Sequence, residues 1–190
     1  LNSIFSLLKT QVRLLNIILH ITSNGQHLNN EQIITLFEID LTSNEELLIR
    51  IFTNLIRQNY ELPKNVIDSL EQFIENPSVQ IFIIEIYQLL TERHIVIDQS
   101  IINKIVCLLS SSVEFTRRTV ELNSRIASFF KAVAENQPNE VDQTYLPLLL
   151  QLQQPVAIRK DACLAAQALA KHKIMLNSET LQSIIYLLNN

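Results

Sequence analysis

A repeat of about 35 residues runs along the whole chain, and it constrains the fold more than any other feature. Each repeat opens with an apolar residue, then a short polar or proline-containing link, then a new helical pattern. The opening residues are Leu28, Leu62, Ile97, Val141 and Leu176, at spacings of 34, 35, 44 and 35 residues. A period of this length is typical of architectures that stack one supersecondary unit many times. The sequence therefore predicts tandem copies of a single structural unit.

Each unit is predicted to be a pair of helices, because apolar residues recur within it at steps of three and four. A short first helix follows each link, and the second helices are predicted at residues 14–20, 45–58, 78–92, 114–134 and 156–172. Pro77 and Pro155 occupy the same point of two repeats, where proline ends a first helix and is accepted in the first turn of the second. The predicted fold is all-α, an α-α superhelix (solenoid) of about five tandem helix pairs.

The repeat also predicts the domain organisation. We expect residues 1–190 to form a single helical-repeat domain, with units at about 1–29, 30–62, 63–97, 98–141 and 142–176 and a partial unit at 177–190. The fourth unit is about nine residues longer than the others, and the extra residues start at Ser110. Insertions in stacked repeats are usually pushed to a solvent face. Because the pattern is cut at both ends, we expect the chain to be a segment of a longer array.

The second helix of the last complete pair resembles that of a HEAT repeat, in which an apolar–Arg pair precedes small residues that allow close packing. The matching residues are Pro155, Val156, Ile158, Arg159, Ala162, Ala165 and Leu169. The resemblance to HEAT and armadillo-type repeats extends over essentially the whole chain. It implies an extended superhelix that holds other macromolecules along a concave surface lined by second helices.

Polar residues on the outward side of the second helices are candidate partner-binding groups. Asn54 resembles one asparagine of the ladder with which armadillo proteins hold an extended peptide, although its equivalents are His20, Gln88, Ser128 and Ala168. An ordinary solvated polar face is the alternative interpretation. Near Asn54, Arg50 and Thr53 are also predicted to point outward. Arg57 is also predicted to point outward, and its equivalents in the other repeats are Ser23, Thr91, Lys131 and Lys171.

Charge divides unequally between the two kinds of helix. Counted with the turn that follows each of them, second helices together with residues 1–29 carry 13 Lys and Arg against ten acids, whereas first helices carry two against nine. A basic second-helix face would favour a partner rich in Asp, Glu or phosphate, unless the excess is scattered around the helices. The candidate binding residues are Arg50, Asn54, Arg57, Gln88, Arg117, Arg118, Arg125, Lys131, Arg159 and Lys171. Ile84 and Tyr87 add an apolar spot that is either an anchor pocket or covered by a neighbouring helix.

Several classes of function are not expected for this chain. The four histidines are spread over three repeats without metal-ligand spacing, no glycine flanks a serine as in a nucleophile elbow, and no acid–base pair is indicated. With one Gly in 190 residues, glycine-rich phosphate loops are excluded. We therefore expect no catalytic residue, metal, cofactor or small-molecule substrate.

Net charge, hydropathy and cysteine content restrict the kind of partner and the cellular location that we expect. A net charge of −4 argues against nucleic acid as the partner, and no stretch reaches the roughly 18 apolar residues that a membrane helix needs. Cys107 and Cys163 lie in apolar runs and are predicted to be reduced core thiols, which fits a cytoplasmic or nuclear location.

The expected function is that of a non-catalytic protein-interaction scaffold, which binds a macromolecular partner, such as an acidic or extended peptide, on the concave second-helix face. Two alternatives stay open. The chain could be a regulatory helical-repeat domain of a larger multidomain enzyme or signalling protein, or a weak binder of the nucleic-acid backbone along a basic strip.

Overall fold

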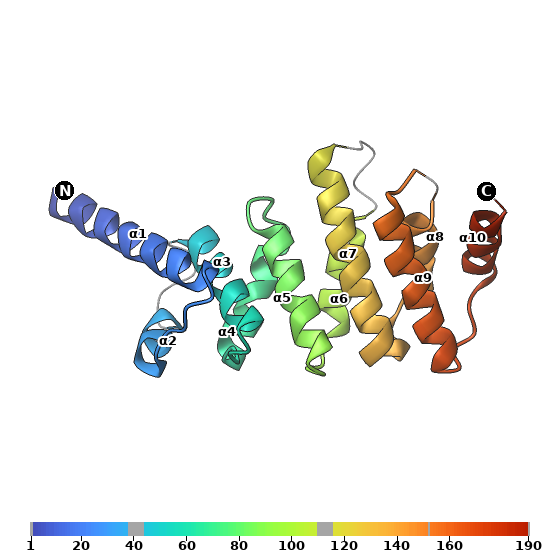
Figure 1. The fold of residues 1–190 in the computed structure, drawn as a ribbon, viewed down its shortest axis with the longest axis horizontal. Helices are drawn as coiled ribbons and strands as arrows, with labels where there is room; N and C mark the ends of the chain where they lie inside the picture. Colours follow the sequence, from blue (N-terminus) through green and yellow to red (C-terminus); the bar gives the residue numbers. More distant parts are fainter. Residues whose placement is uncertain (1, 38–43, 110–115, 152, 190) are drawn as a thin grey trace. The chain divides into compact units, whose positions relative to one another are not determined.

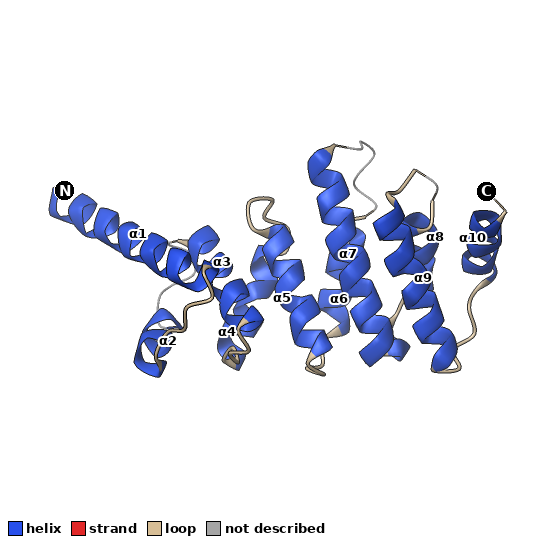
Figure 2. Ribbon diagram, in the orientation of Figure 1, coloured by secondary structure: helices blue, strands red, loops and turns tan. Residues whose placement is uncertain are grey.

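The structure is a computed structural model that describes residues 2–37, 44–109, 116–151 and 153–189. Every regular element in these residues is a helix, and they contain no strand (Figure 2). The all-α prediction is therefore confirmed for this part of the chain. Contacts divide the chain into two compact units, Leu1–Ile86 and Tyr87–Asn190, which are described separately below (Figure 1).

The first unit consists of long second helices with shorter helices between them. Its elements are α1 (Asn2–Ser23), α2 (Asn30–Phe37), α3 (Glu45–Arg57), α4 (Lys64–Leu70), a single 3-10 turn (Glu71–Phe73) and the first half of α5 (Gln80–Glu92). Helix α1 packs against α3. The core of this unit is apolar along one side of α3, where Leu48, Ile51 and Leu55 recur at the period of a helix face and are fully buried.

The second unit continues from α5. Its elements are α6 (Gln99–Cys107), α7 (Arg117–Asn136), two 3-10 turns (Pro138–Glu140 and Gln143–Tyr145), α8 (Leu146–Leu149), α9 (Val156–Lys171) and α10 (Ser178–Leu188). Helix α7 packs against both α6 and α9, and α8 packs against both α9 and α10. Small residues of α9, among them Ala162 and Ala165, are fully buried and let neighbouring helices approach closely.

The predicted second helices at 45–58, 78–92, 114–134 and 156–172 agree with α3, α5, α7 and α9 to within a few residues. Two other helices differ from the prediction. The first helix predicted after residue 142 consists of one 3-10 turn followed by the short helix α8. Pro147 in α8 has no N–H with which to donate a helical hydrogen bond. Helix α1 is longer than the predicted 14–20. The expected insertion after Ser110 lies outside the described residues up to 115, and from Arg117 onward it is part of α7.

Four second helices end in the same way, with a residue in the left-handed conformation. These residues are Gly25, Asn59, His94 and Lys173, with φ of 72°, 69°, 61° and 61°. In each case the next N–H donates back to a carbonyl five residues earlier, as from Tyr60 to Leu55 at 3.0 Å. This is the Schellman pattern, which satisfies carbonyls that the last helical turn leaves free. Only one of the four positions is a glycine, so the other three adopt a backbone conformation that costs a non-glycine residue free energy.

Candidate functional site

The outward side of α3 carries three of the predicted binding residues on one stripe. Arg50, Asn54 and Arg57 follow one another at steps of four and three, which places them on the same face of the helix. Thr53 was also predicted to point outward, and this is wrong. The Thr53 side chain is buried, and its hydroxyl donates to the Ile49 carbonyl at 2.8 Å.

The stripe borders a small polar cleft in the first unit, with a volume of about 180 Å³. Its walls come from three second helices. The lining residues are Leu19 and Ser23 of α1, Arg50, Thr53, Asn54 and Arg57 of α3, and Phe82 of α5. The structure therefore brings the predicted α3 residues together at one concave site, and it adds contributors from α1 and α5 that sequence reasoning did not single out.

Arg57 is held at the cleft by an ion pair with Glu85 of α5. Its Nε donates to Glu85 Oε1 at 2.7 Å, and Nη2 donates to the same oxygen. Glu85 is only 5% exposed, whereas the side chain of Arg57 is 48% exposed. A charge-assisted bond of this kind fixes the orientation of the guanidinium, and it joins α3 to α5. Because Glu85 balances its charge, Arg57 contributes shape and hydrogen-bond donors more than net charge.

Both the nitrogen and the oxygen of the Asn54 side-chain amide form hydrogen bonds within the first unit. Its Nδ2 donates to Ser23 Oγ at 3.0 Å and to Thr22 Oγ1 at 3.3 Å, while its Oδ1 accepts from Arg57 at 3.4 Å. An asparagine that holds a peptide backbone needs a free donor and a free acceptor. Asn54 has both donors committed to α1, so the structure gives it a role in joining α3 to α1.

Of the two arginines that line the cleft, Arg50 makes the weaker interactions with its neighbours. Its guanidinium carbon lies 5.5 Å from the centroid of the Phe82 ring, and Nη1 lies 3.6 Å from Glu46 Oε1. Both members of the Arg50–Glu46 pair are exposed, and such a pair contributes about 0–1 kcal/mol. The aromatic face orients the guanidinium and leaves its charge accessible.

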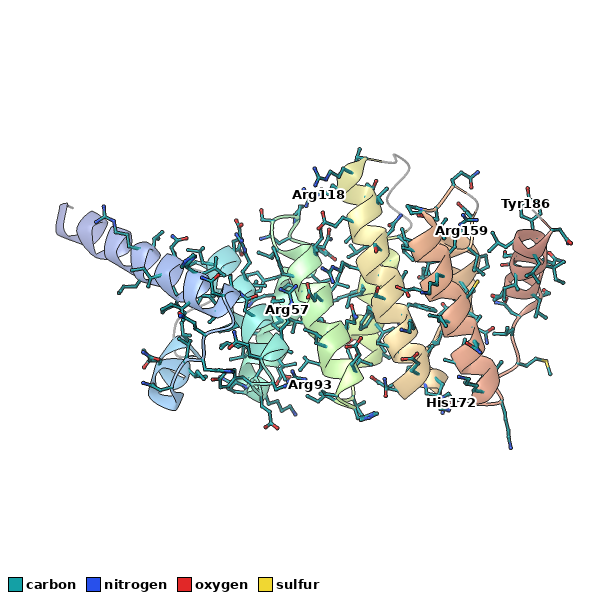
Figure 3. All side chains as sticks on the ribbon, viewed as in Figure 1. Arg57, Arg93, Arg118, Arg159, His172 and Tyr186 are labelled. Atoms are coloured by element: carbon teal, nitrogen blue, oxygen red, sulfur yellow. The ribbon has the colours of Figure 1, made fainter. Side chains whose placement is uncertain are left out.

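The remaining predicted residues lie in the second unit, apart from Ile84. Gln88 donates to Glu92 at 2.8 Å along α5. Arg117 and Arg118 are exposed in the first turn of α7, and Figure 3 labels Arg118 there. Arg125 and Lys131 are half-buried further along that helix. On α9, Arg159 is half-buried and Lys171 is exposed.

Ile84 and Tyr87 are fully buried, so the apolar spot is not on the surface. The interpretation that these two side chains are covered is therefore correct, and the anchor pocket is not formed. Ala168, an equivalent of Asn54, and Thr91, an equivalent of Arg57, are also buried, contrary to their predicted outward position. The reason is that second helices pack against further second helices, as α7 does against α9, and this contact covers positions that a single helix pair would expose. Ser128, at the position equivalent to Asn54, likewise donates to Asp161 of α9 at 2.7 Å.

The prediction that both cysteines are core thiols is wrong. Neither Cys107 nor Cys163 forms a disulfide, and both residues are exposed. Cys107 follows the buried Val106, and a step of 100° around the helix turns it outward, although its sequence neighbours are apolar. Its Sγ lies 3.4 Å from the Tyr145 hydroxyl, and this hydrogen bond, helped by burial, raises the pKa of Tyr145 to about 12. Partial burial raises the pKa of the Cys163 thiol.

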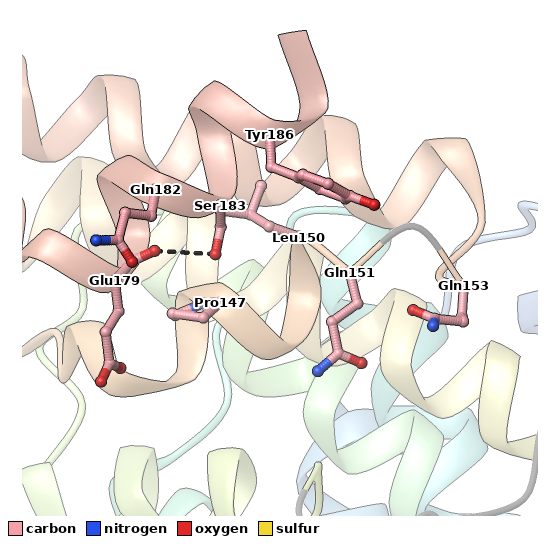
Figure 4. A pocket seen from close by; sticks show the side chains of 8 residues that line it. All are labelled: Pro147, Leu150, Gln151, Gln153, Glu179, Gln182, Ser183 and Tyr186. Atoms are coloured by element: carbon pink, nitrogen blue, oxygen red, sulfur yellow. Dashed lines mark hydrogen bonds between the residues drawn. The ribbon is translucent and has the colours of Figure 1, made fainter. Parts of the chain in front are cut away.

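A second, larger cavity of about 480 Å³ lies between α8 and α10 (Figure 4). Its lining residues are Pro147, Leu150, Gln151, Gln153, Glu179, Gln182, Ser183 and Tyr186. The hydroxyl of Ser183 donates to the Glu179 carbonyl at 2.9 Å, so it is used within α10. Sequence reasoning missed this cavity, and the only signal for it is the helical spacing of the four polar residues of α10.

In the described part of the chain, no three His, Cys, Asp or Glu side chains come together as a metal site. None of its helices combines the length and the apolarity that crossing a bilayer requires.

No protein-family model, curated protein or solved structure matches the chain. The resemblance to HEAT and armadillo repeats therefore stays a prediction from residue spacing.

Proposed function

We propose that this chain is a non-catalytic protein-interaction scaffold, an α-α superhelix of HEAT or armadillo type whose second helices bind an acidic, extended segment of a partner protein. The repeated second helices and their shared left-handed ends support the repeat architecture. The polar cleft beside α3 supports the binding role, and it is the observation that carries the proposal.

The size and lining of the cleft suit one acidic side chain. Cavities that enclose small-molecule ligands typically have volumes of about 300–1,000 Å³. The α3 cleft, at about 180 Å³, is smaller and is lined mainly by polar groups. A carboxylate from an extended peptide fits such a site, with the rest of the peptide lying on the second-helix surface.

Arg50 is the residue that binds the carboxylate in this proposal. Its pair with Glu46 is exposed and weak, so an incoming carboxylate can replace Glu46 at little cost. Phe82 keeps the guanidinium over the cleft during the exchange. Arg57 and Asn54, fixed by Glu85 and by Ser23, form the rigid wall of the site.

The test is fluorescence anisotropy with three labelled peptides of equal length, built from Gly with Glu, Gln or Lys. We expect the chain to bind the Glu peptide, and Arg50→Glu to weaken that binding about tenfold, which is about 1.4 kcal/mol. Lys64→Glu is the matched control, since Lys64 is exposed on the first helix α4 of the same unit and undergoes the same charge change. The control should bind within about twofold of the unmodified chain, since isolated surface charges contribute little.

Two results would contradict the proposal. One is equal affinity for all three peptides, and the other is an equal loss in Arg50→Glu and Lys64→Glu. A labelled single-stranded oligonucleotide tests the alternative of nucleic-acid binding, which predicts tight binding that falls steeply between 50 and 200 mM salt.

A further inference from the structure

Glu85 of α5 occupies the edge of the Arg57 guanidinium that would otherwise meet a ligand. The Nε and Nη2 atoms of Arg57 both donate to Glu85 Oε1, and Nη1 donates to Asn54 Oδ1 at 3.4 Å. Paired N–H groups on one edge are what arginine uses to bind a carboxylate or a phosphate in a bidentate way. Of the two arginines that line the cleft, Arg50 is therefore the one that can turn such an edge toward a ligand.

The two acidic residues beside these arginines differ in how easily they can move away. Glu46 pairs with Arg50 at 3.6 Å and both side chains are exposed, so Glu46 can turn into water when a ligand binds. Glu85 is nearly fully buried, and it follows Phe82, another lining residue, by three positions on the same face of α5. Water screens a buried charge much less than an exposed one. The negative charge of Glu85 therefore stays beside the cleft whether or not a ligand is bound.

This arrangement matches the charge of one carboxylate. Arg50 and Arg57 each bring a positive charge to the cleft, and Glu85 cancels that of Arg57. A phosphorylated side chain carries a charge of about −1.5 to −2 at pH 7 and has three acceptor oxygens. The guanidinium edge of Arg50 would satisfy two of those oxygens, and the remaining charge would be desolvated next to Glu85, which costs free energy.

The charge division between the helices left open whether the partner carries Asp and Glu or phosphate. We infer that Glu85 sets the specificity of the α3 cleft: by neutralising Arg57, it leaves a site that binds a carboxylate side chain and excludes a phosphorylated one. This inference rests on the proposed function, because it concerns the same site. Glu85 acts through Arg57 and is not itself a lining residue, so it is a positioning residue.

The test compares two labelled Gly-rich peptides that differ at one central residue, Glu or phosphoserine, with a Gln copy as the neutral reference. Fluorescence anisotropy gives the dissociation constant of each peptide from the complete chain. At pH 7.5 we expect the phosphoserine peptide to bind at least about fivefold more weakly than the Glu peptide, because like charges are brought together.

Glu85→Gln should remove this preference. Gln keeps the size of the side chain and an oxygen that accepts from Arg57, while the charge of Arg57 is no longer cancelled. We expect the phosphoserine peptide to bind about tenfold more tightly than to the unmodified chain, because a phosphate gains charge-assisted hydrogen bonds between two arginines. The affinity for the Glu peptide should change by less than about threefold, since its single charge is already matched by Arg50.

The matched control is Glu75→Gln, which removes the same charge from an exposed residue of the first unit. It should change the ratio of the two dissociation constants by less than about twofold, since isolated surface charges contribute little. A second measurement needs no variant. At about pH 5.5, below the second pKa of a phosphate at about 6, phosphoserine is mainly a monoanion while a peptide Glu stays ionised, so the preference for Glu should shrink.

The outcomes separate the inference from the proposed function. Equal or tighter binding of the phosphoserine peptide at pH 7.5 overturns the inference alone, provided that the Glu peptide binds more tightly than the Gln peptide. An unchanged ratio in a Glu85→Gln chain with full helix content by circular dichroism also overturns it, as does an equal change in Glu75→Gln. If Glu85→Gln loses helix content, the pH series takes its place, and a ratio that does not fall at pH 5.5 overturns the inference. Equal affinity for the Glu and Gln peptides contradicts the proposed function, and the inference with it.

Discussion

The ion pair between Arg57 and Glu85 gives the most informative test of how the first unit is held together. Arg57→Ala removes the guanidinium that lies against the Oε1 atom of a carboxylate that is only 5% exposed. Removing one partner of a fully buried pair costs 3–5 kcal/mol. Water already reaches Arg57, whose side chain is 48% exposed, and it can partly solvate Glu85 in the variant. We therefore expect a loss of about 2 kcal/mol in the free energy of unfolding, below the fully buried range.

A double-mutant cycle separates the ion pair from the packing of the arginine stem. Glu85→Gln keeps the size of the side chain and removes its charge, so in that background Arg57→Ala should cost only about 0.5–1 kcal/mol, in line with the loss of one neutral hydrogen bond. The coupling energy of the cycle should then be about 1–1.5 kcal/mol. The sequence contains no Trp, so urea unfolding is best followed by circular dichroism at 222 nm.

A coupling energy below about 0.3 kcal/mol, the usual error of additivity, would refute this reasoning. It would mean that the pair does not join α3 to α5 in solution. Arg50→Ala on the same helix serves as the comparison, because its pair with Glu46 is exposed and should show coupling of at most about 0.5 kcal/mol in its own cycle with Glu46→Gln.

Three further predictions concern the second unit. Gln137 bonds to both backbone groups of Ile97, at 3.0 and 2.9 Å, so Gln137→Ala should lower the free energy of unfolding in urea by about 1–3 kcal/mol. Absorbance at 295 nm should show Tyr145 ionising at about 12, and Cys107→Ala should return it toward 10. Since folding raises this pKa, the associated stability is complete below pH 10 and is lost as the pH rises toward 12. Both thiols should react with a disulfide reagent in the folded chain, Cys163 more slowly at a given pH because its pKa is raised; one inert thiol would contradict the exposure seen here.

The local elements were predictable because they depend on short-range periodicity. Steps of three and four between apolar residues located α3, α5, α7 and α9, and the same period placed Arg50, Asn54 and Arg57 on one face. The conformation of the helix ends was harder to predict from the sequence. A left-handed residue was signalled only at Gly25, whereas Asn59, His94 and Lys173 take that conformation without a glycine, because their carbonyl partners and packing stabilise it.

Exposure could not be predicted where it depends on helices outside the pair. Cys107 and Cys163 were assigned to the core from apolar sequence neighbours, and Thr53, Thr91 and Ala168 to the surface from the face of a single helix. In both cases the outcome was decided by which side of the helix another element covers, and a linear pattern does not contain that information.

By itself, the sequence determined that the described chain is helical, where α3, α5, α7 and α9 lie, and that Arg50, Asn54 and Arg57 share one face of α3. Those properties follow from the 3.6-residue period of a helix, which is local. Only the tertiary structure decided that Arg57 contacts Glu85, that Asn54 is committed to Ser23, and that a cleft forms between them and Phe82. These partners are separated by about 30 residues along the chain, and they meet because the packing of successive second helices brings them within hydrogen-bond distance.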